Sequence, residues 1–317
     1  MQTISVVIPV RNEGSKIRAC IEGILSQSVP VNEIIVVDSG STDGTLEILK
    51  EYDKVKVIEV SPATFNHGTT RNVGVDAATG DYCVLTVGDA RAADNDWIKK
   101  MLDCFDSPNV AGVCGQQVVP HEKDKNPTQW FRPMSEPEII KYSFTPEEFN
   151  LLSPDKKRAV CGWDDVTAMY RTDLKRQIPF QHTTFAEDAL WAKDALLAGY
   201  TIVYNPAARV YHYHLEDAEF TFNRYFTVFY HFHKFFGYKP APGGPSFMNN
   251  LRMAKTLVKE NKISWTEKLK WWKYNMAINK ASNKVVAVFN EAVEKGEAEL
   301  DRMHQQLCGK PPIPKKS

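Results

Sequence analysis

The 317-residue sequence lacks a regular cysteine framework, because its six cysteines include no Cys-x-x-Cys pair and follow no even spacing. This absence excludes a disulfide-stapled scaffold and favours reduced thiols in a cytoplasmic protein. The first ten residues lack a basic segment and are broken by Pro9, so we expect no secretory signal there. No apolar run reaches the roughly 20 residues that a membrane-spanning helix needs. We therefore expect a cytoplasmic protein, which can still lie peripherally on the inner face of the membrane.

The sequence also lacks net charge, since 39 Lys and Arg residues balance 39 Asp and Glu residues. A balanced chain of this kind gives no support to nucleic-acid binding. The charge is nevertheless uneven, because residues 250–284 contain nine basic and two acidic side chains. This asymmetry predicts a local electrostatic partner for that part of the chain.

Four short apolar runs alternate with helical patterns in the first part of the chain: TISVVIPV, EIIVVDSG, KVKVIEV and DYCVLTVG. Such alternation predicts βαβ units, right-handed crossovers and an α/β fold with a mostly parallel central sheet. After residue 215 the strand pattern gives way to long helical segments. We therefore expect a first domain over residues 1–215 and a helical C-terminal region over residues 216–317.

Polar turns follow three of these runs and are expected to lie together. In a parallel sheet the ligand binds outside the carboxyl ends of the strands, so the turns at residues 9–13, 38–43 and 88–89 should share one rim. The turn at residues 38–43 could be an ordinary strand-to-helix connection in which Asp43 or Thr42 caps the following helix. Asp38 could equally hydrogen-bond a nucleoside, and the uncommon pairing of the first two turns favours this second interpretation.

Five sequence blocks in this order resemble those of the family 2 glycosyltransferases with the GT-A fold: SVVIPVRNEG, EIIVVDSGSTDGT, FNHGTTRNVG, YCVLTVGDA and FAEDALWA. The match runs from about Ile4 to His214, and FNHGTTRN resembles particularly the rhamnosyltransferase-like branch. The resemblance implies that a sugar moves from a nucleotide-sugar to an acceptor hydroxyl, with inversion at the anomeric carbon and with Mg²⁺ or Mn²⁺ as cofactor. The donor would be a dTDP-, UDP- or GDP-sugar, and the acceptor a glycan or lipid-linked glycan in surface polysaccharide assembly.

The resemblance also implies roles for individual side chains. Asp188 is the expected base that takes the proton of the acceptor hydroxyl, with Glu187 beside it to position the acceptor. On local sequence alone, this acidic pair could simply favour the positive end of a helix dipole. The residues expected to hold the donor nucleotide and its diphosphate are Pro9, Arg11, Asn12, Glu13, Asp38, Ser41, Asp43, His67, Gly68, Arg71 and Gly88.

One acid is missing from the expected metal motif, because family members often carry Asp-x-Asp where this chain has Val87-Gly88-Asp89. The rhamnosyltransferase-like branch commonly has only the final acid. A divalent cation needs few protein ligands when phosphate oxygens and water complete its shell. We therefore expect Asp89 to bind metal with His212 or His214, which would share a face in a strand. Both histidines could otherwise be ordinary surface residues.

Two further stretches carry predictions with open alternatives. Trp163, Asp164 and Asp165 could line the acceptor site, because aromatic faces and acids recognise sugars, or they could form a solvated loop. The helical pattern over residues 265–295 is basic and amphipathic and contains three tryptophans, which fits contact with an anionic membrane surface. The competing interpretation of this helix is a homodimer interface.

Two other functions are open on the sequence. A sugar-1-phosphate nucleotidyltransferase shares a nucleotide-binding α/β sheet, but the glycine-rich phosphate loop expected after its first strand is absent from this chain. A non-catalytic nucleotide-sugar binder on a membrane would explain the missing acid before Asp89. The presence of Asp188, Arg71 and the paired histidines in one chain favours the enzyme.

Overall fold

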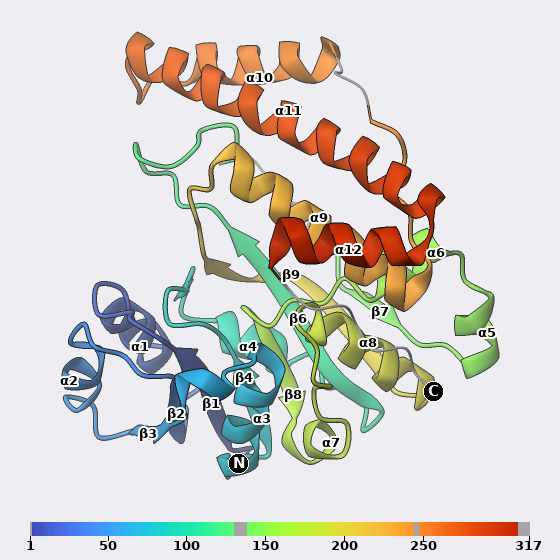
Figure 1. Cartoon of the computed structure of the whole chain (residues 1–317). Helices are drawn as coiled ribbons and strands as arrows, with labels where there is room; N and C mark the ends of the chain where they lie inside the picture. The colour runs from blue at the N-terminus through green and yellow to red at the C-terminus, as the bar shows by residue number, and fades with distance from the viewer. Residues whose placement is uncertain (1, 130–137, 244–246, 310–317) are drawn as a thin grey trace. The chain divides into compact units, whose positions relative to one another are not determined.

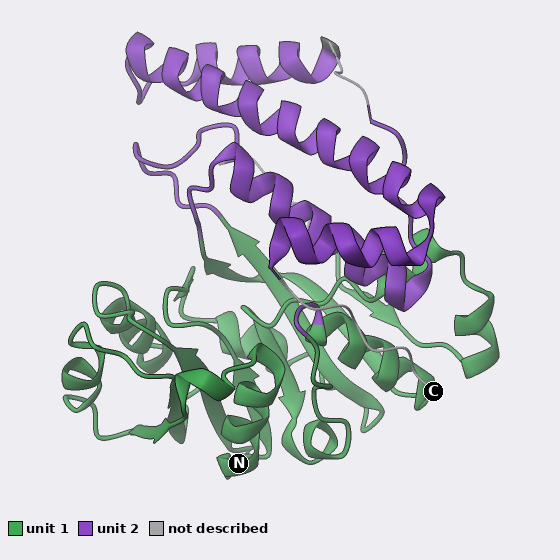
Figure 2. Ribbon diagram, in the orientation of Figure 1, with its two compact units in different colours: residues 1–118, 134–183, 187–212 green, residues 119–133, 184–186, 213–317 purple. Residues whose placement is uncertain are grey.

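Residues 2–129, 138–243 and 247–309 are described in the computed structural model of the chain (Figure 1). The chain divides into two units, which are coloured separately in Figure 2. The first, here called the sheet unit, comprises residues 1–118, 134–183 and 187–212. The second, here called the helical unit, comprises residues 119–133, 184–186 and 213–317. Along the chain, the final change from the sheet unit to the helical unit comes directly after His212.

The first half of the sheet is parallel. Its strands β1 (Ile4–Val10), β2 (Glu33–Asp38), β3 (Val55–Glu59) and β4 (Tyr82–Leu85) lie in the order β3-β2-β1-β4. Helices α1 (Ile17–Leu25), α2 (Thr45–Leu49) and α3 (His67–Ala77) lie between successive strands in the chain, as the alternating pattern predicts. In the register of β1 and β2, Val10 pairs with Asp38, so both strands end at the same rim.

The second half of the sheet is mixed. β8 (Ala168–Arg171) runs antiparallel between β4 and β6 (Val110–Val118), while β9 (Thr201–Tyr211) is parallel to β6. The short strands β5 (Arg91–Ala92) and β7 (Ile140–Tyr142) pair antiparallel with β9. The expected α/β sheet is thus present, with one parallel part from β3 to β4 and a second parallel pair formed by β6 and β9. β8 is inserted between two strands that precede it in the chain, and no local sequence pattern shows its position or its direction.

Buried aliphatic side chains build the core of the sheet unit. Every residue of β2 is buried, and α1 packs with Ile17, Cys20, Ile21 and Ile24 against the same core at i, i+3, i+4 and i+7 spacing. The remaining helices of this unit are α4 (Trp97–Leu102), α5 (Pro146–Leu151), α6 (Pro154–Val160), α7 (Thr172–Gln177) and α8 (Glu187–Leu197). The polar turns follow the carboxyl ends of the strands in this sheet.

The helical unit contains α9 (Ala218–Phe236), α10 (Phe247–Lys259), α11 (Trp265–Lys295) and α12 (Glu297–Cys308). Aromatic residues of α9 form much of its core, where Phe226 and Tyr230 pack with Phe289 of α11. Within the described part of the chain, none of the helices combines the length and the apolarity needed to cross a bilayer.

Candidate active site

Side chains tie the turns after β1 and β2 to each other. Asn12, with a left-handed backbone (φ 58°), donates its N–H to Ser41 Oγ at 2.9 Å and accepts from the Thr42 N–H at 2.8 Å through Oδ1. Asp43 Oδ2 accepts from the Gly14 N–H at 2.9 Å. Three residues predicted to hold the nucleotide therefore hold these two turns together, which fixes the rim in advance of ligand binding.

Asp38, at the end of β2, is buried and turns its carboxylate into its own loop. Its Oδ2 accepts from the N–H groups of Gly40 and Ser41 at 2.9 and 3.0 Å, and the Ser41 hydroxyl donates to Oδ1. These bonds stabilise the turn without a ligand, although the N-cap of α2 is Gly44, with no side-chain cap by Asp43 or Thr42. A contact between Asp38 and a nucleoside stays a prediction.

The turn after β1 lies against the end of β4. A Cβ on Gly88 would lie 3.0 Å from Cγ of Glu13, so a larger residue at position 88 would have to displace the Glu13 side chain. Burial and the nearby Asp89 carboxylate raise the pKa of Glu13. Pro9 is half-buried in β1 and Arg11 is exposed on the same turn. The predicted convergence of these turns at one rim is thus what the strand order produces.

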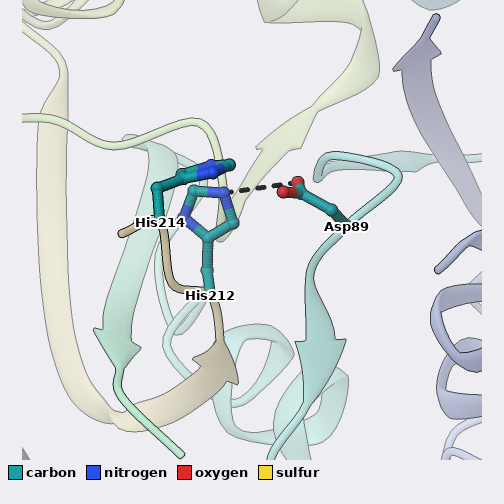
Figure 3. A group of neighbouring side chains, drawn as sticks. All are labelled: Asp89, His212 and His214. Atoms are coloured by element: carbon teal, nitrogen blue, oxygen red, sulfur yellow. Dashed lines mark ion pairs between the residues drawn. The ribbon is translucent and has the colours of Figure 1, made fainter. Parts of the chain in front are cut away.

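Asp89 follows β4 and faces the residue that follows β9. Nε2 of His212 lies 3.3 Å from Oδ1 of Asp89, and Figure 3 shows the imidazole directed at the carboxylate. His214 offers a third ligand atom, and the ligand atoms of the three residues all lie within 4.8 Å of one another. On the other side of the carboxylate, Nζ of Lys16 lies 3.2 Å from Oδ2. The structure brings together the three residues predicted to bind metal.

This group fits a divalent cation. A carboxylate oxygen and imidazole nitrogens are common ligands of such ions in proteins. The Lys16 ammonium beside Asp89 shows that this carboxylate already attracts positive charge. Asp89, His212 and His214 could therefore hold a metal ion whose remaining positions would be open to substrate oxygens and water.

Asp188 lies in the first turn of α8, directly after Glu187. Its side chain is half-buried, and its Oδ1 accepts from the Ala189 N–H at 2.8 Å. Burial raises the pKa of Asp188 well above the usual value, and the charges of Glu187 and Asp165 raise it further. A carboxylate with a raised pKa is a stronger base once ionised, which suits proton abstraction from a hydroxyl.

The backbone before α8 is also unusual. Ala186 has φ 59°, a left-handed conformation that residues with a Cβ adopt rarely and that is concentrated at functional sites. It directly precedes the Glu187–Asp188 pair. The local conformation thus sets the direction in which the first turn of α8 presents its acids.

Arg71 is buried within the sheet unit and paired with acids of that unit. Its Nη1 donates to Oε1 of Glu187 at 2.7 Å, while its Nε lies 3.9 Å from Oδ2 of Asp165. The second distance is too long for a hydrogen bond, and both of those atoms are without a hydrogen-bond partner. This burial favours a role in holding α3 to α8, and the predicted contact with a diphosphate stays a prediction.

The start of α3 approaches α8 closely at Gly68. A Cβ there would lie 3.1 Å from Cβ of Glu187 and 3.0 Å from Cβ of Phe180. Asn66 caps the helix by accepting from the N–H groups of Gly68 and Thr69. His67 is exposed, with its ring centroid 4.9 Å from that of Phe65. Gly68 therefore has a packing role, and a phosphate contact by either residue stays a prediction.

The three residues predicted to meet the acceptor are placed differently from one another. Trp163 Nε1 donates to the Tyr170 hydroxyl at 2.6 Å, and that hydroxyl donates to Asp165. Both Trp163 and Asp165 are buried, and burial raises the pKa of Asp165 to about 6 although the Arg71 charge opposes this. Their burial disfavours direct acceptor contact. Asp164 is half-buried and accepts from Gln117.

Three residues in or near the site escaped sequence reasoning. Lys16 lies beside Asp89, and Gln117 bonds His212 through its side chain. Lys175 is fully buried with Nζ 3.4 Å from the centroid of the Phe180 ring, and burial lowers the pKa of Lys175 to about 7. Only Lys16 has a usable signal in the sequence, because it follows directly on the predicted RNEG turn.

The fold is of the GT-A type. The solved mannosyltransferase PcManGT from Pyrobaculum calidifontis, in complex with GDP-Man and Mn²⁺, shares this fold with a TM-score of 0.57. That likeness covers 96% of this chain and 79% of that one at 19% identity, so it supports the fold alone. The family described as Glycosyl transferase family 2 matches residues 5–170. The chain belongs to this family.

Two curated relatives with named activities match most of the chain. The chain is 31% identical over 231 residues to the O-antigen chain rhamnosyltransferase RfbN of Salmonella typhimurium, covering 71% of each chain. It is 30% identical over 235 residues to the O-antigen chain rhamnosyltransferase WbaN of Salmonella anatum, covering 72% of this chain and 71% of that one. The predicted fold and family are confirmed, and the nucleotidyltransferase and non-catalytic interpretations gain no support.

Proposed function

We propose that the protein transfers a sugar, specifically rhamnose, from a nucleotide diphosphate to a hydroxyl of a glycan or lipid-linked glycan during surface polysaccharide assembly. The family and the two rhamnosyltransferase relatives support this proposal. The structural observation that carries it is the Asp89–His212 pair, 3.3 Å apart at the rim where β1, β2 and β4 end. We infer that residues 1–215 perform the transfer.

Each part of the rim has a task in this reaction. The turns after β1 and β2, held by Asn12 and Asp43, would receive the nucleoside. Asp188 would take the proton from the acceptor hydroxyl, and Glu187 would orient that hydroxyl. Asp89, His212 and His214 would hold the cation, which when bound stabilises negative charge on the departing diphosphate.

The donor set favours Mn²⁺ over Mg²⁺. Mg²⁺ takes oxygen ligands almost exclusively, whereas imidazole is a softer ligand that transition metals accept. Two of the three candidate ligands here are histidines. A dTDP-sugar is our first choice of donor, because it is the donor form implied by the rhamnosyltransferase-like branch, and UDP- and GDP-sugars are the alternatives.

Nucleotide titration with and without metal tests this proposal. We expect calorimetry with dTDP, UDP and GDP to find one nucleotide whose affinity rises at least about tenfold when Mn²⁺ is added, because an ion held by Asp89 and the histidines would attract the negative charge of the diphosphate. Asp89→Ala should remove this Mn²⁺ effect. The matched control is Asp53→Ala, which removes an exposed acid from the turn before β3. If no nucleotide shows a metal effect in the wild-type protein, the proposed metal-dependent transfer is wrong.

We also propose that the helical unit rests on an anionic membrane surface, where a lipid-linked acceptor would be found. On α11, Trp265, Leu269, Trp272 and Met276 lie at i, i+4, i+7 and i+11, which places them on one face. Trp265 is 72% exposed and Leu269 is 55% exposed, whereas Trp272 is partly buried against the cluster around Trp271. Lys273 and Lys280 are exposed beside the stripe. Exposed tryptophan flanked by lysine matches the chemistry of an interfacial helix.

Vesicle sedimentation tests the membrane proposal. We expect binding to vesicles that contain phosphatidylglycerol, weaker binding to pure phosphatidylcholine, and a decline with rising salt. Trp265→Ala should weaken binding about tenfold or more, because burial of a large apolar side chain contributes about 1.5–3 kcal/mol. Leu151→Ala is the matched control, since Leu151 is 87% exposed on α5 of the sheet unit. Absence of binding, together with a dimer that Trp265→Ala dissociates, would favour the homodimer instead.

A further inference from the structure

A chain of hydrogen bonds leads from Asp164 through Gln117 to His212. Nε2 of Gln117 donates to Oδ2 of Asp164 at 2.6 Å. The other end of the same amide, Oε1 of Gln117, lies 2.7 Å from Nδ1 of His212. Nε2 of His212 then faces Asp89 at 3.3 Å. The four side chains thus form one continuous line that ends at the candidate metal ligands.

The chemistry of this line fixes the position of each proton. An ionised carboxylate only accepts hydrogen bonds, so Asp164 requires the NH₂ group of Gln117 on its side. The amide oxygen must therefore face His212, and because this oxygen also only accepts, Nδ1 of His212 must carry a hydrogen. In the neutral ring the other nitrogen, Nε2, is then unprotonated, so its lone pair would be available to a cation placed between the imidazole and Asp89.

The backbone holds both ends of the line in place. Oδ1 of Asp164 accepts from the Val166 N–H at 3.0 Å, which orients the carboxylate. The His212 N–H donates to the Val118 carbonyl at 3.1 Å, which continues the pairing of β9 with β6 beyond the end of β9. In that register Gln117 pairs with Val210, so the amide and the imidazole are brought side by side by the sheet itself.

We propose that Gln117, oriented by Asp164, is a positioning residue that fixes His212 as the Nδ1–H tautomer and so presents Nε2 to a cation beside Asp89. The inference rests on the proposed metal-dependent transfer. It adds two residues that orient a candidate metal ligand without binding the metal themselves. Histidine ligands generally donate their second ring N–H to an acceptor, and loss of that acceptor commonly weakens metal binding 10- to 100-fold. Asp164, predicted to meet the acceptor, acts in this proposal through Gln117 and His212.

The tautomer can be measured in the metal-free protein at a pH where the His212 ring is neutral, since a protonated ring carries hydrogens on both nitrogens. Long-range ¹H–¹⁵N correlation spectra of the ¹⁵N-histidine-labelled full chain distinguish the two ring nitrogens, and His212→Asn identifies the signal. We expect the Nδ1–H form in the wild type and a loss of this single form in Gln117→Leu. Asp164→Asn should have the same effect. An asparagine amide can donate a hydrogen bond to Oε1 of Gln117, so the Gln117 amide can flip and direct its NH₂ group at His212. Finding Nε2–H in the wild type, or an unchanged tautomer in both variants, would overturn the proposal.

A double variant tests whether the directions of the hydrogen bonds, and not a general disturbance of the site, determine the tautomer. In Asp164→Asn combined with Gln117→Glu, the carboxylate at position 117 accepts from both neighbours, so the Nδ1–H form should return. Mn²⁺ titration by electron paramagnetic resonance should show about 10- to 100-fold weaker binding for the two single variants and recovery in the double variant. Mn²⁺ affinity in Gln117→Leu equal to wild type would also overturn the proposal. A wild type that binds no Mn²⁺ would instead contradict the proposed function, while the tautomer would still decide whether Gln117 positions His212.

Discussion

Asp188→Asn is expected to lower kcat about 100- to 10,000-fold, which is the usual contribution of a general base. The amide keeps the size and the hydrogen-bonding outline of the carboxylate but cannot accept a proton from the acceptor hydroxyl. Nucleotide affinity should stay within about twofold of wild type, because the turns after β1 and β2 and the Asp89 group are unaltered. A nucleotide-release assay and calorimetry on the same preparations measure both quantities.

The pKa of Asp188 gives this prediction a pH dependence. Because burial and neighbouring acids raise that pKa, the base is protonated at a pH where an ordinary aspartate is ionised. The acid limb of kcat/KM should therefore lie at a higher pH than the usual aspartate value. An acid limb at the ordinary aspartate pKa would mean that another group serves as base.

Stability should change in the opposite direction to activity. A carboxyl whose folded-state pKa is raised stabilises the fold below its unfolded pKa and loses this contribution as the pH rises through the folded value. Asp188→Asn should therefore have a higher melting temperature than wild type at neutral pH, and the difference should shrink as the pH falls. The control is Asp173→Asn, which alters an exposed acid in the first turn of α7. Equal loss of activity and of stability in Asp188→Asn would show that Asp188 is structural.

Arg71→Met is expected to lower the free energy of unfolding by about 3–5 kcal/mol, the usual cost of breaking a buried ion pair from one side. Methionine fills much of the space but leaves Glu187 without the guanidinium that lies 2.7 Å from its carboxylate. It also removes the positive charge nearest to Asp165. Denaturant unfolding monitored by circular dichroism measures the change.

Two further variants make this result specific. Glu187→Gln added to Arg71→Met should recover part of the stability, because the unpaired buried charge is removed. Arg18→Met, which breaks an exposed pair with Glu51, should cost less than about 1 kcal/mol. If Arg71→Met is as stable as wild type but binds nucleotide weakly, Arg71 binds the diphosphate, as predicted from the sequence. Its ion pair would then not be what stabilises the packing of α3 against α8.

The sequence by itself determined the parts of this protein that depend on local periodicity. Alternating buried strands and helical segments predicted β1 to β4 and the helices between them, and parallel strand order then predicted that the polar turns share one rim. The basic, amphipathic pattern of α11 was likewise visible, because helix-period patterns show directly which residues lie on one face. The family resemblance identified Asp89, His212 and His214 as candidate ligands, and the structure brings them together.

Only the tertiary structure decided which polar groups pair, because those partners lie far apart in the chain. Arg71 and Glu187 are 116 positions apart, Gln117 and His212 are 95 apart, and Lys16 and Asp89 are 73 apart. A single polar residue has no period, so nothing in the sequence shows whether it faces solvent, a ligand or another side chain. The environment of such a residue is set by strand pairing. The register of β6 with β9, and the antiparallel position of β8, determine which polar side chains lie close enough to pair.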